Sequence, residues 1–244
     1  IGVSMTGIGS AAVLQMDMKE AASIVKKENS RVAKLIGINK AARTTCVKPA
    51  GTTSLVLGTS SGIHAWHNDF YIRRLRVGKN ESIYRYLKQN NPELVQDEYF
   101  RPHDTAVIEI PQSAPKGSIL RTESAFDLLT RVKQVATEWV KPGHRKGSNT
   151  HNVSATISLK ANEWDKAGEW MWNNRECYNG LSVLPYDGGS YTQAPFEDIT
   201  KTEFNKRVKL LNDVDLSSII EETDETDLSG ELACAGGSCE ITGL

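Results

Sequence analysis

The stretch Thr45-Cys-Val-Lys-Pro-Ala-Gly-Thr-Thr-Ser54 says most about the fold of this 244-residue chain. Its first residues have the character of a β-strand, and the apolar residues 55–57 behind it predict a second short buried strand. Between them, residues 49–54 present backbone N–H groups without bulky side chains, together with three hydroxyls. Such groups suit phosphate oxygens, especially at a turn that enters a helix, although an ordinary turn has the same composition.

A second run of glycine and hydroxyl residues, Gly58-Thr-Ser-Ser-Gly62, follows closely. Neither run is a P-loop, which needs a second glycine followed by lysine and serine or threonine. Two such loops on either side of one apolar strand favour a phosphate site about as strongly as they favour plain turns.

Helices and strands alternate on both sides of this stretch. Upstream, Asp17 and Glu20 have the spacing of a capping box, and the helix that they begin is expected to end at Gly37. The downstream pattern predicts a strand over 105–110 ended by Pro111, a helix after Thr122, a β-like stretch over 152–159, a helix over 163–173 and a strand over 181–184. This interleaving predicts an α/β fold.

The composition is that of an ordinary globular protein, with a net charge of −1 and 39% apolar residues. No run approaches the twenty apolar residues of a membrane helix, and no signal peptide is visible, so we expect a cytoplasmic protein without a membrane partner. The slight acidity argues against nucleic-acid binding, although Arg73, Arg74 and Arg76 form a basic cluster that faces either phosphate or water. Because the sequence opens on a glycine-rich apolar stretch, we expect a further N-terminal portion before it.

The C-terminal end carries the pair Cys234 and Cys239, separated by Ala-Gly-Gly-Ser. Residues 210–244 before and around it contain no lysine or arginine but many acidic residues, a composition typical of a solvated, extended segment. Exposed pairs of this kind exchange with other thiols through mixed disulfides, and redox shuttling is the favoured interpretation. A structural disulfide and a zinc site stay open as alternatives, but zinc needs about four ligands and no histidine follows His151.

Several segments together resemble one known family. They are, in chain order, residues 45–54 with 60–63, residues 148–159, residues 178–186, and the pair Cys234 and Cys239. Taken together they are similar to the monomeric, adenosylcobalamin-dependent ribonucleoside-triphosphate reductases. The resemblance covers essentially the whole chain, and the combination is far more specific than any single segment.

The resemblance implies a ten-stranded α/β barrel of which residues 1–209 are the C-terminal part, an acidic flexible linker over 210–230 and a redox-active tail over 231–244. It implies that the substrate phosphates are held by Pro49, Ala50, Gly51, Thr52 and Thr53. It also implies that Cys234 and Cys239 re-reduce an active-site disulfide and are themselves reduced by thioredoxin or a similar dithiol. The Asn-x-Cys-x-Glu signature of the radical-bearing cysteine is absent, so this stretch alone is expected to be inactive.

The implied reaction converts a ribonucleoside triphosphate to its 2′-deoxy form by thiyl-radical chemistry, for DNA precursor synthesis, with adenosylcobalamin supplying the radical. One rival is a reductase whose radical comes from a separate metal subunit. Another is a non-catalytic nucleotide-binding or thiol-exchange module.

Other cysteines, histidines and tryptophans could suggest catalytic or binding roles, but structural roles are the favoured interpretation for most of them. Cys46 and Cys177 are expected to be buried small residues rather than nucleophiles. His64 and His67 are expected at the surface or in packing, because no third metal ligand lies near them in the sequence. The tryptophans of the predicted helix over 163–173 fit either an aromatic platform or core packing.

Overall fold

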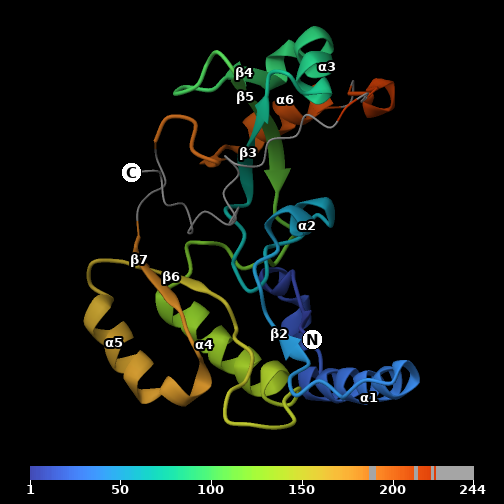
Figure 1. The fold of residues 1–244 in the computed structure, drawn as a ribbon. Coiled ribbons are helices and arrows are strands. Elements are labelled where there is room, and N and C mark those ends of the chain that lie inside the picture. Colours follow the sequence, from blue (N-terminus) through green and yellow to red (C-terminus); the bar gives the residue numbers. More distant parts are fainter. Residues whose placement is uncertain (187–190, 212–213, 221–222, 224–244) are drawn as a thin grey trace. The chain divides into compact units, whose positions relative to one another are not determined.

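The computed structural model describes residues 1–186, 191–211, 214–220 and 223. They form two compact units (Figure 1). The first contains residues 1–66 and 115–186, and the second contains residues 67–114 and the described residues from 191 onward. Both units combine helices with strands, so the chain has a mixed α/β fold, as predicted.

The first unit is built around two parallel strand pairs and three longer helices. Strand β1 (Val3–Ser4) pairs with β2 (Thr45–Cys46), and β6 (Thr156–Leu159) pairs with β7 (Ser182–Pro185). The helical elements are η1 (Ile8–Ser10), η2 (Ala12–Gln15), α1 (Met18–Ile36), α2 (Gly51–Val56), α4 (Ala125–Val135), the π-helical turn η4 (Ala136–Val140), α5 (Trp164–Asn173) and η5 (Arg175–Cys177).

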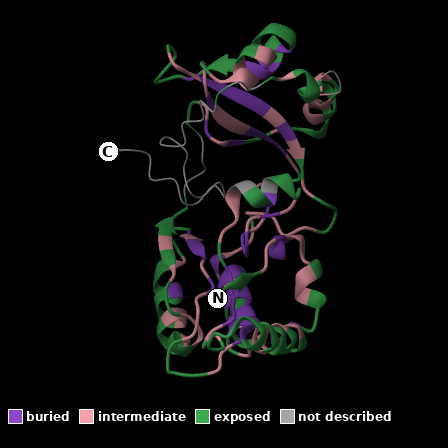
Figure 2. Ribbon diagram, turned by 45° about the vertical axis from the view of Figure 1, so that its right-hand side comes forward, coloured by how far each residue is buried: buried purple, intermediate pink, exposed green. Residues whose placement is uncertain are grey.

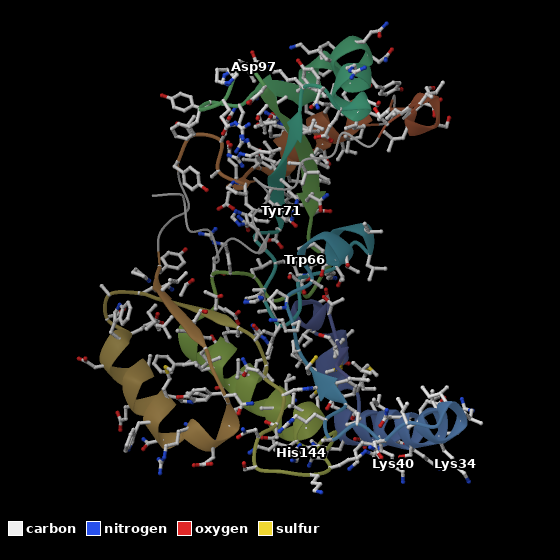
Figure 3. All side chains as sticks on the ribbon, in the orientation of Figure 1. Lys34, Lys40, Trp66, Tyr71, Asp97 and His144 are labelled. Carbon is white, nitrogen blue, oxygen red and sulfur yellow. The ribbon has the colours of Figure 1, made fainter. Side chains whose placement is uncertain are left out.

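Helix α1 begins and ends where its sequence predicts. The Asp17 carboxylate accepts a hydrogen bond of 2.9 Å from the Glu20 backbone N–H. At the other end Gly37 takes a left-handed conformation with φ 73°, which closes the helix. Lys34 lies in the last turn, where its charge complements the helix dipole (Figure 3).

Helix α4 and the turn η4 supply the core of the first unit. Leu129, Val132 and Val135 are fully buried and belong to the same apolar cluster as Ile157 of β6. The helix begins one turn later than Thr122, because Ser124 and Asp127 form a reciprocal capping box. Figure 2 shows this buried layer in purple.

The second unit is a four-stranded antiparallel sheet in the order β4-β5-β3-β8. Its elements are β3 (Phe70–Gly78), α3 (Ser82–Asn90), η3 (Pro92–Leu94), β4 (Val95–Asp97), β5 (Thr105–Ser113), β8 (Phe196–Asp198), α6 (Lys201–Leu211) and η6 (Leu216–Ser218). One apolar cluster, which includes Val77, Leu87 and Ile108, receives residues from both α3 and α6.

Strand β5 corrects one prediction, because it continues through Pro111 to Ser113. Pro111 lies opposite Ile72 of β3, while β4 pairs only with residues 106–108. The second edge of β5 therefore has no described strand partner at Pro111, and the missing proline N–H interrupts no ladder on that side.

The basic cluster of the sequence does not form an exposed patch, because its arginines make contacts within the sheet. Arg74 forms ion pairs with Glu109 and Glu197, and Arg76 pairs with Glu98 at 3.4 Å. Arg73 is buried, with its guanidinium 5.3 Å from the centre of the Phe196 ring. Two of the three charges are thus paired with glutamates of the same unit, and the third lies against an aromatic ring.

A smaller ion pair of the same unit lies at the end of β4. The Asp97 carboxylate forms an ion pair with the Lys79 ammonium, at 2.6 Å, on the protein surface (Figure 3).

Within the described residues, none of the helices is both long and apolar enough to cross a bilayer.

Candidate functional site

The candidate phosphate loop leads directly into helix α2. Residues 49 and 50 precede Gly51, the first residue of the helix, and the Ser54 N–H already donates to the Ala50 carbonyl at 2.7 Å. In a helix the first backbone N–H groups have no intrahelical acceptor, so those of residues 51–53 are oriented toward the space before the helix. This is the arrangement that the phosphate interpretation requires.

The short strand expected over 55–57 is not formed, which is a correction. Residues 55 and 56 end helix α2, and the side chains of Val56 and Leu57 are 83% and 64% exposed. An apolar run of three residues does not distinguish a strand from a helix end. The two glycine and hydroxyl runs are therefore joined by a helix.

Thr6 ties the two runs together. Its hydroxyl donates to the Ser60 carbonyl at 3.0 Å and accepts from the Gly62 N–H at 2.9 Å. It also lies 2.9 Å from the hydroxyl of the buried Ser54. One hydroxyl thus makes all three hydrogen bonds that it can make, and it fixes the start of α2 against the following turn.

The turn over residues 60–63 supports the loop from its other side. The Ser61 hydroxyl accepts a hydrogen bond of 3.0 Å from the Ala50 backbone N–H. Gly62 has φ 54°, and a Cβ placed on it would lie 2.8 Å from the Lys48 carbonyl oxygen. Only glycine lets the turn approach the loop backbone this closely without strain.

His64 connects this turn to strand β6. Its Nε2 accepts a hydrogen bond of 3.1 Å from the Thr156 backbone N–H, and its Nδ1 lies 3.2 Å from the Ser61 carbonyl. Burial lowers the pKa of His64, so the neutral ring with a proton on Nδ1 satisfies both contacts. The expectation of a packing role is confirmed for this histidine.

A buried ion pair holds the end of the turn. Arg131 of helix α4 donates to both carboxylate oxygens of Glu123, at 2.7 and 2.6 Å. Its Nε also donates to the Ile63 carbonyl at 3.2 Å. Core helix and loop are therefore linked by a charge-assisted contact with fixed geometry.

Cys46 lies close to the loop but in an unreactive setting. The thiol is buried, and burial raises its pKa, so little thiolate forms at neutral pH. Its backbone carbonyl accepts a hydrogen bond of 2.9 Å from the Trp139 indole. The expectation of a buried, structural Cys46 is confirmed, whereas Cys177 is only half-buried.

The remaining predicted site residues are placed as follows. Pro49, Ala50 and Gly51 are half-buried, Thr53 is exposed, and Thr52 lies in the first turn of α2. Cys234 and Cys239 lie outside the described residues, as do the whole predicted tail over 231–244 and residues 212–213, 221–222 and 224–230 of the predicted linker over 210–230. Among the described residues, no group of three histidine, cysteine or acidic side chains is arranged to hold a metal ion.

The tryptophans of α5 do not act as one group. Trp170 packs on the core and stacks on Tyr178 with ring centres 6.4 Å apart. Trp164 and Trp172 are 44% and 70% exposed, and the Arg175 guanidinium lies 5.0 Å from the Trp172 ring centre. Core packing therefore explains Trp170 alone.

Thr6 and Arg131 are the positioning residues that the sequence did not single out. Thr6 lies in the glycine-rich opening, where Gly7 has φ 75° and brings the chain back along the turn. No local pattern relates Thr6 to Ser60, which is 54 positions away. For Arg131 the sequence did contain a signal, because a charged residue beside the apolar face of a predicted helix is seldom buried without a partner.

The chain is similar in sequence to named reductases. It is 28% identical over 209 residues to the adenosylcobalamin-dependent ribonucleoside-triphosphate reductase of Lactobacillus acidophilus, covering 84% of the chain and 27% of that protein. With the enzyme of the same name from Euglena gracilis the identity is 26% over 256 residues, covering 98% of the chain and 33% of the relative. The chain thus spans between a quarter and a third of the length of these relatives. No family model matches it.

The fold points the same way. A crystal structure of a B12-dependent, class II ribonucleotide reductase superposes with a TM-score of 0.71 at 23% identity, over 89% of this chain and 34% of that one. Both comparisons support the prediction of a C-terminal portion. The chain is accordingly a relative, over part of their length, of the adenosylcobalamin-dependent ribonucleoside-triphosphate reductases, as its motifs predict.

Proposed function

We propose that this chain is the C-terminal portion of an enzyme that reduces ribonucleoside triphosphates to 2′-deoxyribonucleoside triphosphates for DNA synthesis. The observation that carries the proposal is the sequence similarity to several reductases that bear this name. The class II fold of the solved neighbour supports it. We further propose that the first unit belongs to a ten-stranded α/β barrel in a cytoplasmic, monomeric enzyme.

Within this enzyme, residues 49–53 bind the substrate phosphates. The first-turn N–H groups of α2 donate to phosphate oxygens, and the positive end of the helix dipole favours their charge. Support comes from the packing of the loop, which Thr6, Ser61 and Gly62 hold by hydrogen bonds and close backbone contact. A loop fixed before the ligand arrives loses little conformational entropy on binding.

Adenosylcobalamin is the proposed cofactor, and it supplies the radical that starts the reaction. None of the described side chains forms a cluster suited to a bare metal ion, and no described residue is assigned to the corrin. The part played by this chain is to orient the triphosphate, while the neutral His64 and the Arg131–Glu123 pair keep the loop in place.

Cys234 and Cys239 are proposed to return electrons to the active site. Reduction of each ribose leaves a disulfide that must be reduced before the next turnover. The terminal pair exchanges with that disulfide, becomes oxidised itself and is reduced in turn by thioredoxin or a similar dithiol.

The complete enzyme tests the proposal. Ribonucleoside triphosphate should be consumed only when adenosylcobalamin and a dithiol are both supplied. Activity that is unchanged without the corrin would favour a reductase with a separate metal radical subunit. Triphosphate binding without any reduction would favour a non-catalytic nucleotide-binding or thiol-exchange module.

The phosphate loop has its own test. Val56→Ala serves as the control, because Val56 lies at the end of α2, outside the proposed phosphate-binding residues, and is 83% exposed. Replacing Gly51 by proline, by contrast, removes one first-turn donor and should raise KM for the triphosphate. An unchanged KM in the proline variant would place the phosphates elsewhere.

A further inference from the structure

The end of helix α6 and the segment behind it make contacts that the proposed reaction does not explain. The helix continues to Leu211, past residue 209, where the acidic composition begins. Leu210, Leu211 and Val214 pack against the apolar cluster of the second unit. The first residues of the acidic stretch are therefore attached to a folded surface.

A hydrogen bond fixes the next residue. The Asp215 backbone N–H donates to the Tyr86 hydroxyl of helix α3 at 3.1 Å. The Tyr86 ring belongs to the apolar cluster, so packing determines where its hydroxyl lies. Helix α3 thus holds Asp215 through Tyr86, while Leu210, Leu211 and Val214 are held by the apolar cluster.

The turn that follows is closed by its own side chains. The Asp215 carboxylate accepts from the Ser217 N–H at 3.0 Å, from the Ser217 hydroxyl at 2.6 Å and from the Ser218 hydroxyl at 3.1 Å. The bond from Ser217 is the main reason that the pKa of Asp215 is lowered. The carboxylate therefore remains charged, and the turn remains closed, at neutral pH.

The helix itself is held along the sheet, so the attachment has a rigid base. Arg207 donates to the buried Glu109 at 2.8 Å, and the ring of Phe204 lies 5.1 Å from that of Phe70. Movement of residues 214–218 away from the sheet requires loss of the Val214 contacts and of the Tyr86 bond together.

We propose that residues 210–211 and 214–218 form a tail anchor, which fixes the point on the second unit from which the chain continues to Cys234. The proposal rests on the proposed function of Cys234 and Cys239. Cys234 comes 16 residues after Ser218, the last residue of the anchor, and 23 residues after Leu211. At about 3.4 Å per extended residue, the anchor reduces the greatest span from about 78 Å to about 54 Å. Tyr86 and Val214 are thus positioning residues that set how far the cysteine pair reaches.

A deletion series in the complete enzyme tests the tail anchor. Residues between 221 and 233 are removed stepwise, and turnover is measured with thioredoxin and with a small dithiol that enters the active site directly. The same series is made in an anchor-release background, Tyr86→Phe with Val214→Asp, which removes the hydroxyl and places a carboxylate against apolar side chains. The anchor predicts that the release background tolerates about seven more deleted residues before thioredoxin-driven turnover is lost.

Two controls accompany the series. Ile220→Asp adds the same charge at a side chain that is 80% exposed, and it should leave the critical deletion unchanged. Variants in which the deleted residues are replaced by Gly and Ser at constant length separate the effect of length from that of charge. Turnover with the small dithiol confirms that each variant is folded.

The outcomes distinguish the two proposals. Loss of thioredoxin turnover at the same deletion in both backgrounds, or in neither, would overturn the anchor. If Cys234→Ser reduces turnover equally with both reductants, the proposed shuttle fails instead. Hydrogen exchange gives an independent reading, because the Asp215 amide should exchange slowly in the parent and at least tenfold faster in Tyr86→Phe; equal rates would also overturn the anchor.

Discussion

The contact between the 60–63 turn and the candidate phosphate loop gives a quantitative prediction. Gly62→Ala forces an alanine into φ 54° and places its Cβ 2.8 Å from the Lys48 carbonyl oxygen and 3.4 Å from the Pro49 Cα. The left-handed conformation costs about 1–2 kcal/mol, and relief of the overlap with the loop backbone costs about 1–3 kcal/mol more. We therefore expect a loss of about 2–5 kcal/mol in the free energy of unfolding.

Gly58→Ala is the matched control for this prediction. Gly58 has φ 59°, but nothing lies within 4 Å of the added Cβ, so only the conformational cost of about 1–2 kcal/mol applies. Urea unfolding of both variants measures the difference, which isolates the contact with residues 48 and 49. For a protein of this size each kcal/mol also lowers Tm by about 2–4 °C.

Kinetics of the complete enzyme extend the test to function. Gly62→Ala should raise KM for the ribonucleoside triphosphate, because the loop backbone must shift by a few tenths of an ångström to accommodate the methyl group. Gly58→Ala should leave KM near that of the parent. Equal losses of stability and equal KM values for the two variants would refute the reasoning that the turn positions the loop.

Three further predictions follow from the same contacts. Thr6→Val leaves the Gly62 N–H without its acceptor and should destabilise the chain by about 1–3 kcal/mol in urea unfolding, with Thr6→Ser restoring most of the loss. Burial lowers the folded-state pKa of His64, so its contribution to stability is full above about pH 6.5 and is lost as the pH falls below that value. The urea midpoint of the parent should therefore be higher than that of His64→Gln at about pH 7.5, and the two midpoints should approach each other at about pH 5.5. Glu109→Gln breaks a buried ion-pair network and should lower the free energy of unfolding by about 3–5 kcal/mol, whereas Glu28→Gln in an exposed pair should cost far less; similar losses would contradict the buried network.

Local signals in the sequence predicted the elements whose ends are chemically marked. Helix α1 follows from the Asp17 cap and the Gly37 stop, and α5 and β7 lie within about a residue or two of their expected bounds. These elements are specified by neighbours a few residues apart, so a linear pattern contains the information. The same holds for the buried stripe of α4.

Features that depend on distant contacts could not be predicted in this way. The strand expected over 55–57 is a helix end, because the helix starts at Gly51 in a hydroxyl-rich run that favours no element strongly. The arginines of β3 looked like a surface patch because Glu98, Glu109 and Glu197 come from other parts of the chain. For the candidate site, the composition of residues 49–54 predicted the loop, which stays a prediction as a phosphate site, but no sequence pattern predicted the Thr6 and Arg131 contacts that hold it.

The second unit is assembled from two separate stretches of chain, with consequences for its synthesis. Tyr71 of β3 pairs with Asp198 of β8, 127 positions later. At about 5–20 residues per second, a ribosome needs roughly 6–25 s to make the intervening polypeptide. During that interval the edge of β3 that later pairs with β8 has no partner strand, so its backbone amide and carbonyl groups can pair with any extended peptide nearby. Newly made chains are therefore most prone to aggregate before the β8 residues leave the ribosome. Chaperones that cover exposed edge strands would matter most during that interval.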